Sequence, residues 1–313
     1  MKTLKTDVAI LGAGTAGMTA YRAASEHTKN LLIIEGGAYG TTCARVGCMP
    51  SKLLISAADA AHPGQGAGAF GVHAGPVRID GREVMDRVRR ERDRFVGFVV
   101  DAVHGWPEPH RLQGFARFVS PHELLVGSDT LVIADRIVIA TGSSPNVPDG
   151  WRAALGEKLL VNDDVFSWQT LPQSVAVIGS GVIGLELAQA LHRLGARVRV
   201  YGRGTRLGPL TDPVLQEVAR TTIGTELDMT LAVDAFVPQL DSSGRVRIDS
   251  HTLDGHQHTE TFDFLLAAVG RHANVGALGL ENSGLPLDAA GIPVVDRRTG
   301  QIGDSHVFLA GDV

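Results

Sequence analysis

The sequence predicts an α/β fold made of two three-layer units, each built on a parallel β-sheet. Three observations indicate this class. A chain of 313 residues suits about two domains of roughly 150 residues. An apolar strand followed by a glycine-rich turn and a helical pattern occurs twice. The 38 glycines and the aromatic content of 5% favour tight turns and closely packed backbone over an aromatic-rich sandwich.

The first copy of this unit begins with a short, continuously apolar strand at residues 7–11. It leads directly into a turn with Gly12, Gly14 and Gly17, and after a helical pattern the next strand ends at Glu35. Such a pattern is typical of a Rossmann-like dinucleotide site. The glycines permit the turn, the approach of pyrophosphate and helix packing, and the acid binds a ribose hydroxyl.

The second copy repeats the first without a gap. A strand at residues 175–178 precedes Gly179, Gly181 and Gly184, each 167 positions after its counterpart in the first turn. A helix and the strand at residues 198–201 follow. Two dinucleotide sites in one chain predict electron transfer between a tightly held cofactor and an exchangeable one.

The nicotinamide preference rests on the position that corresponds to Glu35. The offset places Gly202 there, so no carboxylate would repel a 2′-phosphate, and Arg203 and Arg206 follow closely. Gly184 as third glycine favours NAD, but it bears only indirectly on the phosphate. We therefore expect NADP(H) to be accepted at least as well as NAD(H). The alternative is that both arginines are solvated loop charges.

Cys43 and Cys48 follow soon after Glu35 and are the two cysteines of the chain. Their number excludes a secreted disulfide scaffold and leaves no second pair for a four-ligand zinc site, so no metal is expected. Residues five apart in a regular helix are too far apart for a disulfide, but Gly47 and Pro50 could distort the turn. The pair is therefore either a strained, redox-active disulfide or two buried thiols.

With this cysteine block the chain resembles the pyridine nucleotide-disulfide oxidoreductases, the family of dihydrolipoamide dehydrogenase, glutathione reductase and mercuric reductase. The similarity extends over the whole chain. Its motifs are the two glycine turns, Glu35, the segments 43–48 and 50–52, Ala140-Thr141-Gly142, Glu186, Ala268-Val269-Gly270-Arg271 and Ala310-Gly311-Asp312.

The resemblance implies a role for each matching residue. FAD would occupy the first turn and NAD(P)(H) the second, with Asp312 on the ribityl chain of the flavin. Cys48 would lie against the flavin while Cys43 exchanges with substrate, and Lys52 would pair with Glu186 beside the flavin N5. Taken alone, Lys52 and Glu186 read as a surface lysine and a helix acid. Further cofactor-binding residues would be Thr141, Gly142, Gly270 and Arg271.

Domain boundaries follow from a Pro- and Gly-containing linker near residues 145–150. We expect an FAD-binding domain at 1–148, an NAD(P)-binding domain at 149–272, and a return to the FAD-binding domain at 273–313. Family members also carry a C-terminal interface domain with a His-Glu pair, which we expect this chain to lack. A full-length protein would be a homodimer, and this chain a monomer with poor turnover.

The predicted function is that of an FAD-dependent disulfide oxidoreductase of dihydrolipoamide dehydrogenase type, acting in cell redox homeostasis on a small dithiol or disulfide. Alternatives are an NADPH enzyme similar to mercuric or glutathione reductase, a flavin-binding module without turnover, and a flavoprotein oxidase or monooxygenase. The net charge of −5 argues against nucleic acid or anionic membrane as partners. No apolar run reaches the roughly 18 residues of a membrane span, and no signal peptide is visible, so we expect a cytoplasmic protein.

Overall fold

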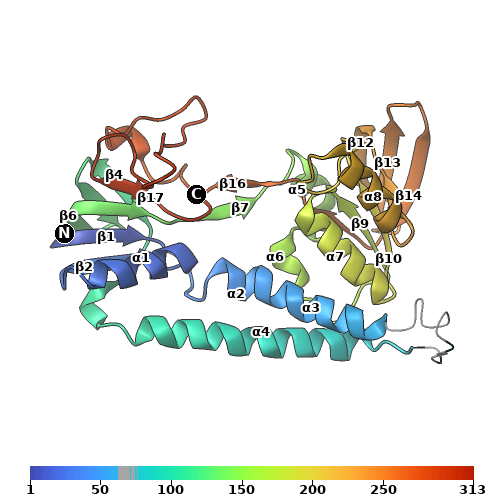
Figure 1. Ribbon diagram of the computed structural model, residues 1–313, viewed down its shortest axis with the longest axis horizontal. Helices are drawn as coiled ribbons and strands as arrows, with labels where there is room; N and C mark the ends of the chain where they lie inside the picture. The colour runs from blue at the N-terminus through green and yellow to red at the C-terminus, as the bar shows by residue number, and fades with distance from the viewer. Residues whose placement is uncertain (63–70, 72–74, 76) are drawn as a thin grey trace. The chain divides into compact units, whose positions relative to one another are not determined.

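A computed structural model describes residues 1–62, 71, 75 and 77–313 (Figure 1). The chain divides into two compact units. The first comprises residues 1–45, 94–144 and 271–313, and the second comprises residues 46–93 and 145–270. Two of these junctions lie near the boundaries expected from the sequence, whereas residues 46–93 pack with the second unit. Helices α2 and α4 and strand β7 each cross a junction.

The first unit contains one large sheet and the helices that accompany it (Figure 1). Its elements in chain order are β1 (Lys2–Leu11), α1 (Thr15–Ser25), β2 (Leu31–Glu35), α2 (Thr42–Val46), the C-terminal end of α4 (Gly81–His104), β3 (Arg111–Gln113), β4 (Ala116–Ser120), β5 (Glu123–Val126), β6 (Thr130–Ile139), β7 (Ser143–Pro145), β16 (Arg271–Ala273) and β17 (Val307–Leu309), with short 3₁₀ turns at Glu108–His110 and Leu280–Asn282.

The sheet has the strand order β3-β2-β1-β6-β5-β4, and β17 also pairs with β6. Strands β1, β2, β3, β6 and β17 are parallel, whereas β4 and β5 are antiparallel. In β1, Ile10 belongs to a buried cluster with Tyr21 of α1, and its neighbours Ala9 and Leu11 belong to another with Phe118. Both faces of β1 are therefore buried, which explains its continuously apolar sequence.

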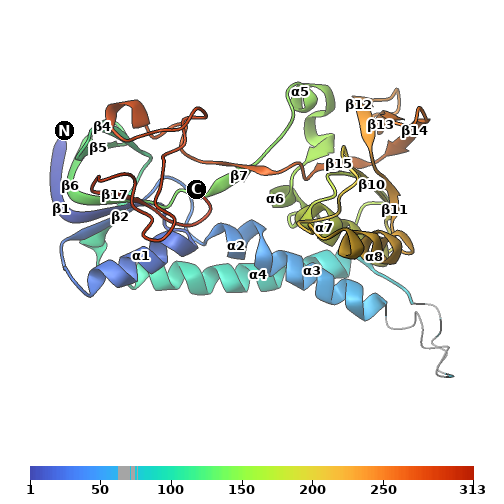
Figure 2. The same ribbon diagram turned by 45° about the horizontal axis from the view of Figure 1, so that its top comes forward.

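The second unit contains a parallel sheet, a smaller antiparallel sheet and several helices (Figure 2). Its elements are α3 (Cys48–Ala61), the start of α4, α5 (Trp151–Leu155), β8 (Leu159–Leu160), α6 (Asn162–Val165), β9 (Ser174–Ile178), α7 (Val182–Arg193), β10 (Arg197–Tyr201), α8 (Pro213–Gly224), β11 (Asp228–Thr230), β12 (Val233–Leu240), β13 (Val246–Thr252), β14 (Gln257–Phe262) and β15 (Phe264–Ala267), with a 3₁₀ turn at Gly156–Lys158.

The parallel sheet runs β11-β10-β9-β15-β8, and the antiparallel sheet runs β12-β13-β14. Alternating residues of β9 again face two cores. Val175 and Val177 join a cluster with Leu187 of α7 and Leu54 of α3, whereas Ala176 joins one that includes residues of β12, β13 and β14. The second unit is thus three-layered, and the predicted α/β class with two parallel sheets is confirmed.

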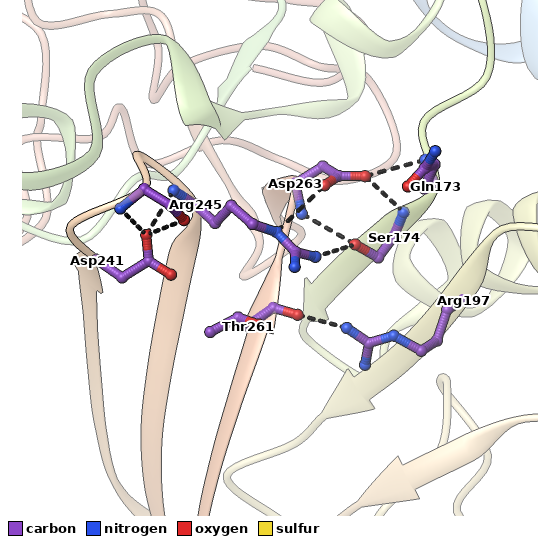
Figure 3. Close-up of polar contacts among 8 residues, drawn as sticks. Gln173, Ser174, Arg197, Asp241, Arg245, Thr261 and Asp263 are labelled. Atoms are coloured by element: carbon purple, nitrogen blue, oxygen red, sulfur yellow. Dashed lines mark hydrogen bonds and ion pairs between the residues drawn. The ribbon is translucent and has the colours of Figure 1, made fainter.

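A polar network fastens the antiparallel sheet to the parallel one. The carboxylate of Asp263, between β14 and β15, accepts hydrogen bonds from the backbone N–H groups of Gln173 (3.0 Å) and Ser174 (2.9 Å) at the start of β9. The Ser174 hydroxyl accepts in turn from the Asp263 backbone and from Arg245, as Figure 3 shows. Because Ser174 is buried, these bonds satisfy groups that would otherwise be costly to remove from water.

In the part of the chain that the structure describes, no helix combines the length and apolar character needed to cross a membrane.

Candidate functional site

The first glycine turn connects β1 to α1 through very close backbone contacts. Gly12 has a φ of +103°, and a Cβ on it would lie 2.4 Å from the carbonyl oxygen of Ala140. A Cβ on Gly17 would lie 1.8 Å from the Gly12 carbonyl oxygen. Both positions therefore require glycine. Around Gly14, by contrast, nothing lies within 4 Å of a Cβ position, which leaves its backbone open to a ligand.

Glu35, the last residue of β2, is fixed beside this turn. Its Oε2 accepts a hydrogen bond from the backbone N–H of Ala13 (2.8 Å), and its Oε1 accepts one from Gly37 (2.8 Å). Each carboxylate oxygen keeps a second lone pair for another donor. The acid predicted to bind a ribose hydroxyl is thus held next to the turn predicted to bind pyrophosphate.

The carboxyl ends of two more parallel strands meet the same turn. After β6, the backbone N–H of Ala140 donates to the carbonyl oxygen of Leu11 (2.8 Å). After β17, Gly311 packs closely against α1. A Cβ on Gly311 would lie only 2.7 Å from the Cβ of Ala16. The next residue, Asp312, is exposed. These contacts gather the predicted residues at the edge where open α/β sheets bind ligands.

Thr141 supplies an independent sign that a polar ligand fits here. Its Oγ1 is buried and has no hydrogen-bond partner among the residues of the described chain. Its Cα would be 3.4 Å from a Cβ on Gly12, so the hydroxyl belongs to the turn region. Buried polar atoms nearly always have partners, and a bound cofactor can provide one. The unpaired Thr141 hydroxyl and the open space at Gly14 are both consistent with a bound dinucleotide at this turn.

Asn274, to which the sequence assigned no role, and Arg271 hold this region in place. The side-chain amide of Asn274 donates to the carbonyl oxygen of Thr141 (3.1 Å). The backbone N–H of Asn274 donates to the carbonyl oxygen of Gly142 (2.9 Å). Arg271, predicted to bind cofactor, donates from Nε to the Ser143 hydroxyl (2.9 Å) and from Nη2 to its carbonyl oxygen (2.7 Å). No local sequence signal marks these pairs, because more than 100 positions separate the partners.

The second glycine turn has the same geometry as the first. Gly179 has a φ of +117°, and a Cβ on it would lie 2.2 Å from the carbonyl oxygen of Ala268. A Cβ on Gly184 would lie 2.1 Å from the Gly179 carbonyl oxygen, whereas nothing lies within 4 Å of a Cβ on Gly181. This turn therefore also fits a dinucleotide.

The segment after β10 differs from its counterpart in the first unit. Gly202 is buried where the first unit has Glu35, and Ser180 occupies the place of Ala13. The Ser180 hydroxyl donates to the carbonyl oxygen of Arg206 (2.8 Å), which draws the following loop to the glycine turn. Arg203 and Arg206 are both exposed, and Arg206 also donates to the carbonyl oxygen of Leu210 (2.9 Å). Two cations thus lie on a loop tied to the second turn.

The two cysteines occupy consecutive helices that are interrupted at Gly47. Cys43 lies in α2 and is partly buried, and Cys48 is the exposed first residue of α3. Gly47 has φ −125° and ψ −119°, which is not helical, and Pro50 fits the first turn of α3, where no backbone donor is needed. The sequence allowed a distorted turn at this place, and Gly47 forms one. Both residues are thiols here, so the disulfide stays a prediction.

Lys52 and Glu186 are brought together as the resemblance implied. Lys52 Nζ lies 2.6 Å from Glu186 Oε1, with side chains 65% and 23% exposed. The pair joins α3 to α7, whose apolar residues Leu54 and Leu187 share one core. This packing is tertiary, since 134 positions separate the two residues.

Comparison with known proteins agrees with this geometry. Dihydrolipoyl dehydrogenase of Chlamydia pneumoniae is 28% identical over 319 residues, covering 99% of this chain and 66% of the relative. Mercuric reductase of Shigella flexneri is 32% identical over 317 residues, covering 97% of this chain and 54% of the relative. A solved structure, the HOCl-induced flavoprotein disulfide reductase RclA from Escherichia coli, aligns with a TM-score of 0.77 at 22% identity, covering 98% of this chain and 66% of that one.

The chain therefore spans about two thirds of the length of the first of these relatives and about half of the second. A match to the pyridine nucleotide-disulphide oxidoreductases extends over residues 6–313. Since this match includes both glycine turns, the cysteine block and the Gly-Asp segment, the chain belongs to the pyridine nucleotide-disulphide oxidoreductase family.

Proposed function

We propose that this chain binds the two nucleotides of a disulfide oxidoreductase and transfers electrons between a nicotinamide nucleotide and a small dithiol or disulfide. The observation that carries the proposal is the presence of two complete dinucleotide turns in one chain. In each turn, a Cβ on the first or third glycine would collide with a backbone carbonyl oxygen, and the central glycine is open to a ligand. Family membership supplies the two cofactors, FAD and NAD(P)(H).

FAD is assigned to the first turn, and NAD(P)(H) to the second. Gly14 and the N-terminus of α1 would receive the pyrophosphate of FAD, Glu35 its ribose, Thr141 and Gly142 its polar groups, and Asp312 its ribityl chain. Gly181 and the start of α7 would receive the pyrophosphate of the nicotinamide nucleotide. When bound, the flavin supplies a two-electron carrier between thiols and nicotinamide.

The thiol chemistry belongs to Cys43 and Cys48. With the pair oxidised, a substrate thiolate attacks the Cys43 sulfur, a mixed disulfide forms, and Cys48 leaves as a thiolate. The second substrate thiol then attacks the mixed disulfide, which releases the substrate as a disulfide and Cys43 as a thiolate. Two electrons have now passed from the substrate to the cysteine pair. Lys52, held by Glu186, would provide positive charge where negative charge develops on reduction.

We propose dihydrolipoamide as the dithiol, because several relatives that cover nearly the whole chain are dihydrolipoyl dehydrogenases. A specific observation favours a second candidate, an NADPH-dependent reductase of the mercuric or glutathione reductase type. In that case Gly202 supplies no carboxylate that would repel a 2′-phosphate, and Arg203 and Arg206 offer it two cations. The mercuric reductase relative is 32% identical, whereas the dihydrolipoyl dehydrogenase of Chlamydia pneumoniae is 28% identical.

The decisive experiment examines the purified chain for flavin and for the cysteine pair. Its intact mass is confirmed, and the flavin released on denaturation is identified as FAD. Mild reduction should then produce a long-wavelength absorption band from a thiolate beside the flavin. Cys48→Ser should abolish the band and Cys43→Ser should keep it. Retention of the band in both variants would refute the assignment of roles, and absence of bound or bindable FAD would refute the proposed function.

The two substrate candidates are separated by turnover. Dihydrolipoamide with NAD⁺ and glutathione disulfide or Hg²⁺ with NADPH are supplied in parallel to the same preparation. A rate with one pair that exceeds the other by tenfold or more selects between them, and Cys43→Ser serves as the inactive control because it removes the exchanging thiol.

A further inference from the structure

Thr41 lies shortly before Cys43 and has a backbone conformation that is rare for its residue type. Its φ is +53°, and among the described residues other than glycine only Ala232, with a φ of +56°, also has a positive φ. Thr41 is β-branched, which makes the left-handed region especially unfavourable for it. Such a conformation persists only where the surrounding contacts hold it, and strained residues of this kind cluster at functional sites.

The contacts that hold Thr41 lead directly into α2, the short helix that carries Cys43. Thr41 Oγ1 accepts a hydrogen bond from the backbone N–H of Ala44 (3.1 Å). The carbonyl oxygen of Thr41 accepts one from the backbone N–H of Arg45 (3.1 Å). Because α2 comprises only Thr42–Val46, it is too short to be stable on its own. The start of the helix therefore depends on Thr41 as its cap.

Arg45 closes the same segment from the other side. Its Nη1 donates to the carbonyl oxygen of Ala38 (3.2 Å), so the side chain reaches back along the loop that precedes the helix. The aliphatic part of Arg45 covers Gly40, since a Cβ on Gly40 would lie 3.1 and 3.2 Å from the Arg45 Cδ and Cγ atoms. Val96 Cγ1 of α4 would lie 2.9 Å from the same Cβ. The loop before Thr41 is thus held as well, which leaves this residue little freedom to relax.

The direction in which the chain enters α2 decides where the sulfur of Cys43 lies. If Thr41 left the left-handed region, the helix would continue from the loop in another direction. Cys48 begins α3 after the break at Gly47, and a disulfide tolerates only a narrow range of distances and side-chain directions. A fixed start of α2 therefore reduces the conformational entropy that is lost when the two cysteines are joined.

We propose that Thr41 is a positioning residue for the cysteine pair, whose hydroxyl holds the strained start of α2 and keeps Cys43 ready to pair with Cys48. The inference rests on the proposed function, since it requires the two thiols to form a disulfide. Valine has the shape of threonine without the hydroxyl, and serine has the hydroxyl without the β-branch. Replacement of Thr41 by each of them separates the hydrogen bond to Ala44 from the shape of the side chain.

The test equilibrates the purified 313-residue chain with mixtures of glutathione and glutathione disulfide, without nicotinamide nucleotide and in the absence of oxygen. The Cys43 thiolate attacks glutathione disulfide, which forms a mixed disulfide and releases one glutathione thiolate. The Cys48 thiolate then attacks the Cys43 sulfur, and the second glutathione leaves. Two electrons pass from the cysteine pair to glutathione disulfide, and the two thiol protons go to the released glutathione. The masses of the chain after alkylation give the equilibrium constant.

Thr41→Val should lower the equilibrium constant for disulfide formation about tenfold, because loss of the cap widens the range of positions that Cys43 occupies before the bond closes. Thr41→Ser should keep the constant within about twofold of the natural value, since the hydroxyl remains. Ala232→Gly is the matched control, because it relieves the other positive φ in the loop between β11 and β12, and it should leave the constant unchanged.

Each outcome decides a separate question. If the natural chain forms no intramolecular disulfide at any glutathione ratio, the thiol chemistry of the proposed function fails. If the natural chain forms it and Thr41→Val has the same constant, or if Thr41→Ser or Ala232→Gly lowers the constant as far as Thr41→Val does, only the role of the Thr41 hydroxyl is refuted.

A second variant covers the case in which Thr41→Val does not fold. Thr41→Ala removes the same hydroxyl together with the β-branch that opposes a positive φ. It should lower the equilibrium constant about fivefold, as expected for the loss of a cap. An unchanged constant in Thr41→Ala would equally refute the role of the hydroxyl.

Discussion

The two glycine turns have the same backbone geometry but different surroundings. In both, the first glycine lies under a carbonyl oxygen from a neighbouring strand end, Ala140 in one unit and Ala268 in the other. In both, the first glycine N–H donates over 2.7 to 2.8 Å to the carbonyl oxygen at or near the end of the next strand. The central glycine is open in each. The turn itself therefore does not determine which nucleotide binds.

The difference lies one strand away. In the first unit Glu35 uses both carboxylate oxygens on backbone N–H groups, and in the second unit Gly202 provides no side chain at all. There Ser180 binds the loop that carries Arg203 and Arg206. We therefore expect the repeated turn to bind pyrophosphate, and the residue at the end of the second strand to discriminate between nucleotides.

The largest effect is expected when the open central position of each turn is filled. Gly14→Ala should weaken FAD binding and Gly181→Ala should weaken nicotinamide nucleotide binding, each by about a hundredfold, because a methyl group would occupy the cofactor's space. Folding should be unaffected, since nothing lies within 4 Å of either Cβ. Flavin retention and nucleotide titration measure the two effects. Loss of both cofactors in either single variant would contradict the separation of the two sites.

Filling the third glycine should instead affect stability. A Cβ on Gly17 or Gly184 would lie 1.8 or 2.1 Å from a carbonyl oxygen, so Gly17→Ala and Gly184→Ala should each lower the free energy of unfolding by about 2 kcal/mol. Gly97→Ala, an open position within α4, should be neutral or stabilising by up to about 1 kcal/mol. Denaturant titration measures the free energy of unfolding of each variant. Equal stability of all three variants would show that the backbone of the two turns shifts to accommodate the added methyl group.

Removal of the two loop cations sharpens the difference between the units. Arg203→Ala combined with Arg206→Ala should weaken NADPH binding about tenfold and leave NADH binding unchanged, because only NADPH has the 2′-phosphate. Arg247→Ala, which removes an arginine paired with Asp249 on β13, is the control. A natural preference for NADH of tenfold or more, or an unaltered affinity of the double variant for NADPH, would refute the assignment.

The smallest effect concerns pH, because each unit contains a carboxylate with a lowered pKa. A hydrogen bond from Arg193 lowers the pKa of Glu226, and a hydrogen bond from Thr28 lowers that of Asp7. Such groups stabilise the folded state above their ordinary pKa near 4, and the contribution is lost as the pH falls through the lowered value. In Glu226→Gln and Asp7→Asn, the decrease of the melting temperature between pH 7 and pH 3 should therefore be smaller. An unchanged decrease in both would show that other carboxylates dominate.

Much of the fold was predictable because its signals are local. A continuous apolar strand, a positive φ at Gly12 and Gly179, and the fixed offset between the copies are properties of short segments, and the predicted α/β class is confirmed. The residue types also allowed the interruption that the structure has at Gly47. The predicted domain division placed residues 46–93 with the first turn, but their packing follows the core shared by α3 and α7, which no local pattern contains.

The site divides in the same way. The positions of the tight turns follow from the sequence alone, since a missing Cβ or a ring constraint acts within a few residues. The ion pair of Lys52 with Glu186, the hydrogen bond of Arg271 to Ser143 and the contact of Phe115 with Gly36 are evident only in the tertiary structure. These contacts join segments distant in the chain, and which side chains meet depends on how the sheets and helices pack around their cores. Local chemistry thus fixed the turns, and packing decided what surrounds them.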